Sequence, residues 1–458
     1  MTGTSVLRVA IVGGGPSGFF AAEHLRKQHP ALEVDLFDRL PTPYGLVRGG
    51  VAPDHPKIKA VTRVFDRIAA DPAVRFLGNV TVGKDLTRED LRRHYHAVIY
   101  AVGANTDRHL GIPGETLAGS HAATDFVGWY NGHPDYADRS FDLSAERVAV
   151  VGMGNVAIDV IRILASTPEA LETTDIAAPA LEALRTSRVR EIWMLGRRGP
   201  VQAAFTNPEL RELGEMADAD VVVRPEEITP DPASEAALAV LEHRHTAERN
   251  IETLRAFAAK PRSGRRRTIH LRFLCSPLEI AGSGRVEQLV IGRNRLVPGS
   301  DGNLRAEATG ERETLDVGLV FRSVGYLGTG VPGLPLDARK GIIPNDRGRV
   351  LENGAAAPGE YVAGWIKRGP TGVVGTNKPD AAETADLLLE DFKAGRLAAP
   401  AEPERAAVDR CLAGRGVRVV TWADWQRLDA IERARGAALG RPRLKFTRRP
   451  DMFAALAS

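Results

Sequence analysis

The sequence predicts an α/β protein in which one nucleotide-binding domain is interrupted by another. Two glycine-rich turns are the main evidence, GGGPSG at residues 13–18 and GMGNVA at residues 152–157. Each turn follows a run of apolar residues typical of a buried parallel strand, at 9–12 and 148–151, and each opens a segment with helical spacing. A strand, glycine turn and helix in this order bind the pyrophosphate of a dinucleotide. The chain is therefore expected to hold two nucleotides.

The remaining elements fit the same architecture. The first unit continues with a strand at 34–37 and closes with the apolar run 97–104. The second unit contains a helical insertion at 164–188 and closes with a matching run at 317–326. The chain then returns to a strand at 361–363 and a helix from 378 to about 393. The last sixty or so residues are rich in Pro and Arg and predict a covering arm, not a domain.

The glycines have separate roles in such a turn. Gly13 and Gly152 allow the tight turn after the strand, and Gly15 and Gly154 let the backbone approach a pyrophosphate. Gly18 permits close packing of helix on strand. The first peptide N–H groups of each helix then face the phosphates with the positive end of the helix dipole.

The two units differ in the residue that follows their second strand. Asp38 lies 20 residues beyond Gly18, the spacing of an acid that accepts hydrogen bonds from ribose hydroxyls. Arg197 and Arg198 follow the strand at 192–195, and guanidinium groups bind a ribose phosphate. The first turn thus favours a nucleotide with free ribose hydroxyls and the second favours NADP over NAD. The alternatives are an ordinary turn aspartate and a solvated basic turn.

Composition narrows the class of protein. The 458 residues carry a net charge of +3, which is too small to indicate nucleic-acid binding. Cys275 and Cys411 lie far apart, which excludes a CxxC redox pair and a cysteine-ligated iron–sulfur cluster. We expect no membrane span, no signal peptide and a cytoplasmic location.

Four long strings point to one family. They are PYGLVRGGVAPDHPK at 43–57, DFVGWYN at 125–131, GRRGPVQAAFT at 196–206 and GWIKRGPTGVVG at 364–375. Together the chain resembles the adrenodoxin reductase type of ferredoxin–NADP reductase, a family with actinobacterial and mitochondrial members, over nearly its whole length. The resemblance implies two Rossmann-like, three-layer α/β domains with mainly parallel sheets. It places an FAD domain at 1–106 and 323–458, with the covering arm, and an inserted NADP domain at 107–322.

The resemblance also implies site residues. FAD would be bound by Gly13, Gly15, Ser17, Gly18, Asp38, Leu46, Val82, Trp365, Gly372, Val373 and Val374. NADP would be bound by Gly152, Gly154, Asn155, Val156, Arg197, Arg198, Glu209 and Gly372. His55 and Glu209 are the polar residues expected near the reacting rings, and no metal ligands are expected. The alternatives are a rigid loop residue for His55 and a core aromatic for Trp365.

Two positions depart from the family pattern. Gly14 stands where the family tends to carry serine, and Asp38 replaces the commoner glutamate. The first change is harmless for backbone approach. The shorter Asp38 side chain would reach the ribose through water.

By the same resemblance, the activity is that of a ferredoxin–NADP(+) reductase. NADPH gives a hydride to flavin N5, and single electrons pass to a ferredoxin, a small acidic iron–sulfur protein. A basic face would steer this partner, and the reductase is expected to be a monomer. Candidate docking residues form two groups, although charged runs are often only solvated faces. They are Arg211, Arg244, Arg249 and Arg255, and then Arg441, Arg443, Lys445, Arg448 and Arg449.

Three other functions fit the sequence less well. A flavin disulfide reductase needs a redox dithiol, which the cysteine pattern forbids. The small subunit of glutamate synthase carries an N-terminal cysteine-rich cluster domain, which is absent here. A flavin-binding scaffold without turnover would not need an intact NADP site.

Overall fold

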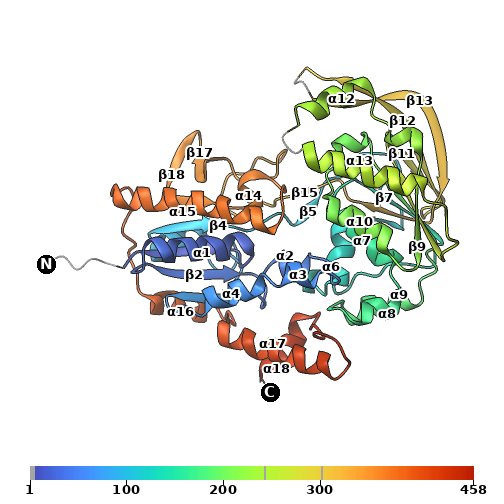
Figure 1. The fold of residues 1–458 in the computed structure, drawn as a ribbon. Helices are drawn as coiled ribbons and strands as arrows, with labels where there is room; N and C mark the ends of the chain where they lie inside the picture. Colours follow the sequence, from blue (N-terminus) through green and yellow to red (C-terminus); the bar gives the residue numbers. More distant parts are fainter. Residues whose placement is uncertain (1–5, 242–243, 301–302, 458) are drawn as a thin grey trace. The chain divides into compact units, whose positions relative to one another are not determined.

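The chain divides into two compact units in the computed structural model, which describes residues 6–241, 244–300 and 303–457 (Figure 1). The first unit contains the residues up to Val51, His55–Thr106 and the chain from Tyr326 onward. The second, here called the inserted unit, contains Ala52–Asp54 and Asp107–Gly325. The chain passes between the units at the short paired strands β5 (Thr106–Asp107) and β15 (Tyr326–Leu327).

The first unit is built on an eight-stranded sheet with the strand order β16-β17-β18-β4-β1-β2-β3-β19. Its five central strands are parallel, and β16, β17 and β19 are added antiparallel at the edges. The strands are β1 (Arg8–Val12), β2 (Glu33–Asp38), β3 (Val74–Gly78), β4 (Ala97–Tyr100), β16 (Asn345–Asp346), β17 (Arg349–Glu352), β18 (Ala355–Val362) and β19 (Val420–Thr421).

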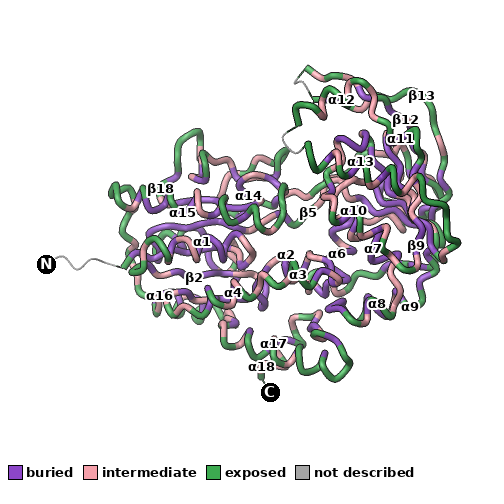
Figure 2. The backbone as a smooth tube through the Cα atoms, in the orientation of Figure 1, coloured by how far each residue is buried: buried purple, intermediate pink, exposed green. Residues whose placement is uncertain are grey.

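Both faces of this sheet are buried, so the unit has three layers. Val9 and Ile11 of β1 pack with side chains of α1 and α15, whereas Ala10 and Val12 pack in a second core with α16. Figure 2 shows the central strands in the colour of buried residues and the helices with exposed outer sides. The helices are α1 (Pro16–Gln28), α2 (Leu46–Gly49), α3 (Pro56–Lys59), α4 (Thr62–Ala69), α5 (Arg88–His94), α14 (Trp365–Arg368), η3 (Val374–Thr376) and α15 (Asn377–Lys393).

The C-terminal segment is helical and packs on the first unit. It contains α16 (Arg405–Gly414), α17 (Trp422–Ala437) and α18 (Arg449–Ala457). Trp425 is fully buried, and its indole N–H donates to the hydroxyl of Tyr44 at 3.1 Å. Glu432 is also buried and accepts from Arg48 and from the backbone N–H of Phe446. The expected arm is thus an integral part of the core.

The inserted unit is built on a six-stranded, fully parallel sheet with the order β6-β14-β7-β8-β10-β9. Its strands are β6 (Ser120–Ala122), β7 (Arg147–Val151), β8 (Glu191–Leu195), β9 (Ala219–Val223), β10 (Arg267–Arg272) and β14 (Leu319–Arg322). Its helices are α6 (Ala123–Tyr130), η1 (Pro134–Tyr136), α7 (Asn155–Ala165), α8 (Pro168–Glu172), α9 (Ala178–Arg185), η2 (Pro200–Gln202), α10 (Asn207–Glu215), α11 (Pro225–Ile228), α12 (Pro232–Ala239) and α13 (Arg244–Ala259).

Helices cover only one face of this second sheet. Val148 and Val150 of β7 pack on that side, with α6, α7 and α9. Ala149 and Val151 face a three-stranded antiparallel sheet made of β11 (Cys275–Ala281), β12 (Gln288–Pro298) and β13 (Leu304–Asp316). The third layer of the inserted unit is therefore a β-sheet, which the strand and glycine pattern did not indicate.

None of the helices among the described residues is long and apolar enough to cross a membrane.

Asp391 of α15 offers a test of the packing of the first unit. Burial alone would raise its pKa, but bonds from Arg349, Tyr361 and Arg396 outweigh burial and lower the pKa to about 2. The ionised form is thus stabilised in the folded state, and its contribution is lost as the pH falls from about 4 towards 2. We expect Asp391→Asn to lower the free energy of unfolding by roughly 2 kcal/mol at pH 7.

The measurement is urea denaturation of both proteins at pH 7 and at pH 3. The difference between them should shrink at the lower pH. Asp386→Asn, at an exposed position on the same helix, is the control and should have little effect at either pH. An equal loss for Asp391→Asn at both pH values would contradict the charge argument.

Candidate functional site

The first glycine turn lies at the carboxyl end of β1, with its backbone open towards a ligand. The Gly13 N–H donates to the Phe37 carbonyl at 2.7 Å, and its φ of +120° favours glycine. A Cβ at Gly13 would lie 2.3 Å from the Ala101 carbonyl oxygen, whereas one at Gly15 would meet nothing nearer than 3.9 Å. No side chain caps α1, which starts at Pro16. The turn therefore offers free N–H groups and empty space to a pyrophosphate.

Asp38 at the end of β2 is tied to this turn. Its carboxylate accepts from the Gly14 N–H and from the Leu40 N–H, both at 2.8 Å. Burial raises the pKa of Asp38, and these two hydrogen bonds oppose the rise. A side chain at Gly14 would lie 2.9 Å from the carboxylate, so the glycine found there matches the aspartate. Asp38 is placed to accept a ribose hydroxyl with the lone pairs that remain.

Leu46 and Val82 differ in how they relate to the turn. Leu46 begins α2, and Gly45 before it lies against Gly15, where an added Cβ would be 3.0 Å from the Gly15 Cα. Val82 follows β3 and pairs with Leu86 in an isolated bridge. The structure thus brings Leu46 beside the first turn, whereas Val82 pairs with Leu86 and shows no contact with that turn among the described residues.

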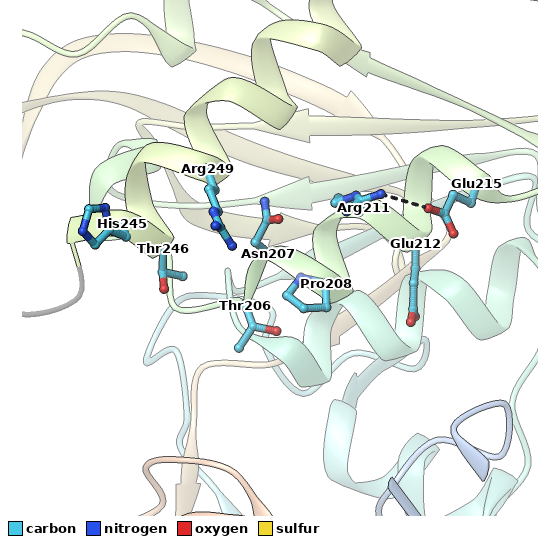
Figure 3. Close-up of a pocket in the computed structure, with 9 residues that line it drawn as sticks. All are labelled: Thr206, Asn207, Pro208, Arg211, Glu212, Glu215, His245, Thr246 and Arg249. Atoms are coloured by element: carbon cyan, nitrogen blue, oxygen red, sulfur yellow. Dashed lines mark ion pairs between the residues drawn. The ribbon is translucent and has the colours of Figure 1, made fainter. Parts of the chain in front are cut away.

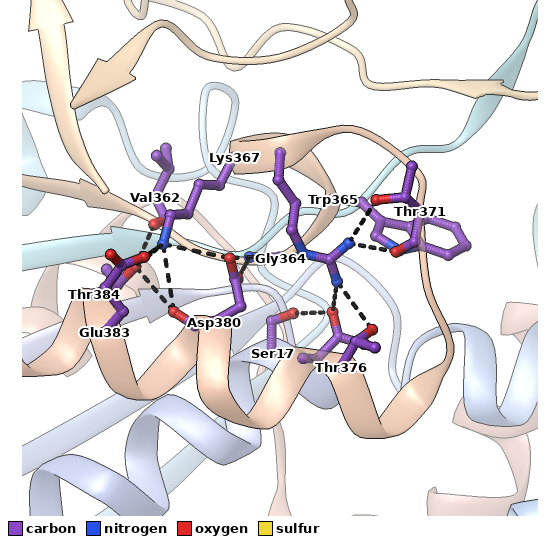
Figure 4. A network of polar contacts seen from close by, with 12 residues as sticks. Ser17, Val362, Gly364, Trp365, Lys367, Thr371, Thr376, Asp380, Glu383 and Thr384 are labelled. Atoms are coloured by element: carbon purple, nitrogen blue, oxygen red, sulfur yellow. Dashed lines mark hydrogen bonds and ion pairs between the residues drawn. The ribbon is translucent and has the colours of Figure 1, made fainter. Parts of the chain in front are cut away.

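The segment around Trp365 meets the first turn at Ser17 (Figure 4). The Ser17 hydroxyl donates to the Asn377 side-chain oxygen at 3.1 Å, at the first residue of α15. Gly364 lies against Ser17, where a Cβ would be 2.1 Å from the hydroxyl oxygen, and its N–H donates to Asp380 at 2.5 Å. Two segments about 360 residues apart in sequence therefore form one site.

The loop after α14 exposes residues suited to contact the flat ring system of a cofactor. The Trp365 indole N–H donates to the Thr371 carbonyl at 3.1 Å, and the Arg368 guanidinium donates to the same carbonyl. Trp365 is only half-buried, so it is not a core aromatic. Gly372 is exposed, and Val373 keeps 54% of its surface accessible. Val374 is half-buried at the start of η3, before the positive end of α15.

The second glycine turn repeats the construction of the first. The Gly152 N–H donates to the Leu195 carbonyl at 2.9 Å, and a Cβ there would lie 2.1 Å from the Ser323 carbonyl oxygen. A Cβ at Gly154 would meet no atom within 4 Å, and no side chain caps α7, which starts at Asn155. The Asn155 side-chain oxygen accepts from the Thr206 N–H at 2.8 Å. Val156 follows in the first turn of the helix and is half-buried.

Arg197 and Arg198 follow β8 without an acidic partner. Among the residues that the structure describes, neither guanidinium forms an ion pair or donates a hydrogen bond. Burial lowers the pKa of Arg198, and the positive charge of Arg197 lowers it further. Two mutually repelling cations without a counter-charge form a site for an anion.

Glu209 belongs to a charged cluster around Arg162 of α7. The Arg162 guanidinium contacts Glu209 at 3.1 Å and Glu212 at 3.0 Å, both on α10. It also contacts Asp159 at 2.7 Å and Asp54 at 2.6 Å. Burial alone would lower the pKa of Arg162, but these carboxylates raise it well above its usual value. Sequence reasoning missed Arg162, because nothing in a helical arginine indicates which acids it will meet.

His55, the next residue after Asp54, belongs to the first unit. It is buried at the N-terminus of α3, and its carbonyl accepts from the Lys59 N–H at 3.2 Å. A rigid loop residue, which is the alternative interpretation of His55, would occupy the same position.

A surface groove of about 480 Å³ lies between α10 and α13 (Figure 3). The Arg249 side chain extends from α13 towards Asn207 at the start of α10, and Arg211 pairs with Glu215 at 3.8 Å. Thr206, whose N–H binds Asn155 of the second turn, lines the same groove. The groove is lined by Thr206, Asn207, Pro208, Arg211, Glu212, Glu215, His245, Thr246 and Arg249.

Two dinucleotide turns, one ending at an acid and one at two arginines, define a protein of the two-nucleotide flavoprotein oxidoreductase class. Residues 7–191 match the family model of the pyridine nucleotide-disulphide oxidoreductases. NADPH-ferredoxin reductase FprA of Mycobacterium tuberculosis is 51% identical over 448 residues, which cover 96% of each chain. Human mitochondrial NADPH:adrenodoxin oxidoreductase is 43% identical and matches 98% of this chain and 92% of its own length.

A solved structure of M. tuberculosis FprA in complex with NADPH agrees over the whole fold. It matches with a TM-score of 0.93 and 49% identity, covering 99% of this chain and all of the other. The chain belongs to the family that joins the bacterial NADPH-ferredoxin reductases and the mitochondrial adrenodoxin reductases. The predicted family, fold class, FAD and NADP cofactors and enzyme class are thereby confirmed.

Two glycine substitutions test the second turn. We expect Gly154→Ala to keep the fold, because the new methyl group meets no protein atom, and to weaken NADP⁺ binding at least tenfold, because it points into the space for the pyrophosphate. Gly152→Ala should instead destabilise the protein, since its methyl group meets the Ser323 carbonyl.

Isothermal titration calorimetry measures the first effect and thermal unfolding the second. Gly395→Ala is the control for Gly152→Ala. Gly395 is an exposed glycine after α15 that also has a positive φ, but an added methyl group there meets no atom. Unchanged NADP⁺ affinity in Gly154→Ala would show that the pyrophosphate does not lie against this turn.

Proposed function

We propose that this chain is an FAD-dependent ferredoxin–NADP reductase that draws electrons from NADPH and delivers them singly to a ferredoxin-type iron–sulfur protein. The observation that carries the proposal is the contrast between Asp38 and the uncompensated pair Arg197 and Arg198, at equivalent places in the two units. Bound FAD would supply the chemistry that joins two-electron donation to one-electron delivery. The names of the relatives support both the nucleotide and the partner.

The first unit would hold FAD. Its uncapped α1 and the open space at Gly15 suit the pyrophosphate, and Asp38 suits the adenosine ribose. Ser17 ties the first turn to the N-terminus of α15, whose positive end would stabilise charge on the pyrimidine part of the flavin. Trp365 and the loop containing Gly372 and Val373 would hold the ring system, whereas Leu46 and Val82 would line the adenosine half.

The inserted unit would hold NADP(H) in its main stretch, Asp107–Gly325. The turn from Gly152 to Val156 would bind the pyrophosphate, and the two arginines would bind the 2′-phosphate. Each charge-assisted bond to a phosphate contributes about 1.5–3 kcal/mol, and each 1.4 kcal/mol corresponds to a tenfold change in affinity. Glu209 and His55 would lie near the reacting rings, where Arg162 fixes the Glu209 carboxylate.

A basic face of the inserted unit would dock the partner. Arg249 and Arg255 are exposed on α13, and in the described part of the chain neither guanidinium has an acidic partner. Arg211 and Arg244 are exposed too, although Glu215 and Glu248 pair with them. An acidic ferredoxin would meet these arginines beside the groove of Figure 3.

The second basic group expected from the sequence is a poorer docking face, because three of its members, Arg441, Arg443 and Lys445, are buried or serve internal contacts. Arg441 and Lys445 are buried. Arg443 pairs with Asp429 at 2.5 Å and with the buried Glu432 at 3.3 Å. Arg443 holds the chain after α17 onto the helix, and the Lys445 ammonium donates to the Arg48 carbonyl at 3.4 Å.

We also propose that the reductase acts as a cytoplasmic monomer. Cys275 and Cys411 are both free, as is usual for proteins of a reducing compartment. Sedimentation equilibrium of the FAD-loaded protein would test the oligomeric state, and a dimer would contradict it.

The purified protein should be yellow, and anaerobic NADPH should bleach it. Replacing both Arg197 and Arg198 with alanine should reduce the preference for NADPH over NADH by about a hundredfold, since two phosphate contacts are lost. Steady-state kinetics with ferricyanide as the electron acceptor measures both coenzymes. Absence of bleaching would contradict the reductase function, and unchanged discrimination would place the phosphate elsewhere.

Reversing the charge of Arg249 tests the docking face. We expect Arg249→Glu to raise the KM for a ferredoxin from the same organism about tenfold at low salt, with a smaller effect at high salt. Reduction by NADPH in stopped flow should be unchanged. Arg347→Glu, at an exposed arginine of the first unit, is the matched control. Equal effects of the two variants would show general electrostatics and not a docking site.

A further inference from the structure

The loop that carries Arg197 and Arg198 is held by hydrogen bonds to three consecutive carbonyl groups. The Gly196 carbonyl accepts from the Cys275 N–H at 2.8 Å, and the Arg198 carbonyl accepts from the Leu274 N–H at 3.2 Å. The Arg197 carbonyl between them accepts from the side-chain amide nitrogen of Asn294 at 2.9 Å. Of these three donors, only Asn294 uses a side chain, so only this bond can be removed by substitution.

Asn294 is built into the antiparallel sheet behind the loop. It is 7% exposed and lies on β12, where the pairing with β13 shifts register. The second N–H of its amide donates to the Ser276 hydroxyl at 2.8 Å. Its backbone N–H donates to the Leu274 carbonyl, also at 2.8 Å. The side chain is thus fixed in place before it reaches Arg197.

Leu274 shows that this arrangement is maintained against a local cost. Its φ of +56° lies in the left-handed region that a branched residue rarely adopts. Leu274 is bonded on both sides, through its N–H to Arg198 and through its carbonyl to Asn294. Strain of this kind persists where the surrounding contacts fix the backbone and is frequent at functional sites.

The charges explain why the loop needs such support. Arg197 and Arg198 repel each other and have no counter-charge among the described residues, so without a phosphate nothing draws the two guanidiniums together. A loop ordered beforehand binds its ligand more tightly, because less freedom is lost on binding. A bond to the peptide between the two arginines fixes the backbone from which both side chains extend.

We propose that Asn294 is a positioning residue for coenzyme selection: by holding the Arg197 peptide, it aims the two guanidiniums at the 2′-phosphate that distinguishes NADP from NAD. The proposal rests on the proposed function of the arginine pair. Asn294 itself does not touch the nucleotide. It acts on the coenzyme through Arg197 and Arg198 alone.

The test compares Asn294→Ala with Ser276→Ala and with the double arginine variant. Calorimetry measures the affinity for 2′,5′-ADP, which carries the phosphate, and for 5′-AMP, which lacks it. We expect Asn294→Ala to weaken 2′,5′-ADP binding about tenfold and to leave 5′-AMP binding unchanged. Ser276→Ala removes one of the bonds that fix the same amide but keeps the bond to the Arg197 carbonyl, so it should weaken 2′,5′-ADP binding less than Asn294→Ala and leave 5′-AMP binding unchanged.

Thermal unfolding shows whether the variant keeps its fold. If Asn294→Ala is unstable, Asn294→Leu fills the same volume without a donor and should give the same loss for 2′,5′-ADP. Equal weakening of both ligands, or an equal effect of Ser276→Ala, would overturn the proposal, because either result means general damage to the sheet. If the double arginine variant still prefers 2′,5′-ADP, the proposed phosphate site is wrong. If it loses the preference and Asn294→Ala keeps it, only the positioning role is wrong.

Discussion

One hydrogen bond occurs in both units, and both nucleotide turns depend on it. The first glycine of each turn donates its N–H to a carbonyl of the neighbouring strand, Gly13 to Phe37 and Gly152 to Leu195. The acceptor comes one or two residues before the residue proposed to contact the ribose or its phosphate, since Asp38 follows Phe37 directly and Arg197 follows Leu195 by two. The bond therefore sets the distance between the glycine turn and the residue that follows the neighbouring strand. An added β-carbon would clash with a carbonyl oxygen just after the parallel strand on the other side, that of Ala101 for Gly13 and that of Ser323 for Gly152. Both positions therefore require glycine.

From this shared geometry the two sites differ in where their charge is balanced. The Asp38 carboxylate is already bonded to two backbone N–H groups, one of them in the turn itself. Its site is complete within the first unit and needs only neutral hydroxyls from the ligand. The backbone of the arginine pair is hydrogen-bonded, but its two guanidinium charges have no counter-charge among the described residues. That site lacks the counter-charge that an anion such as a phosphate would supply.

The sequence predicts well what depends on neighbours along the chain. Strands, glycine turns and the residues at the strand ends are local patterns, and β1, α1, β7 and α7 lie where those patterns place them. The antiparallel sheet on the inserted unit was not foreseen, because its strands carry no glycine signature and only their packing on Ala149 and Val151 defines their place. In sequence, the C-terminal arginines look like a solvated basic run. In the structure, Arg443 contacts the buried Glu432, which it reaches only because the chain folds back on α17.

The same limit explains why the candidate site was found only in part. Arg197 and Arg198 are visible as a motif, but the residue that holds their peptide lies 97 positions further along the chain. An asparagine in a strand has no pattern of its own, and neither has a leucine in the left-handed region. Recognition of the phosphate thus has two layers of different origin. The cations proposed to touch the ligand can be read from the sequence, whereas the support proposed to aim them arises where the second sheet packs behind the first.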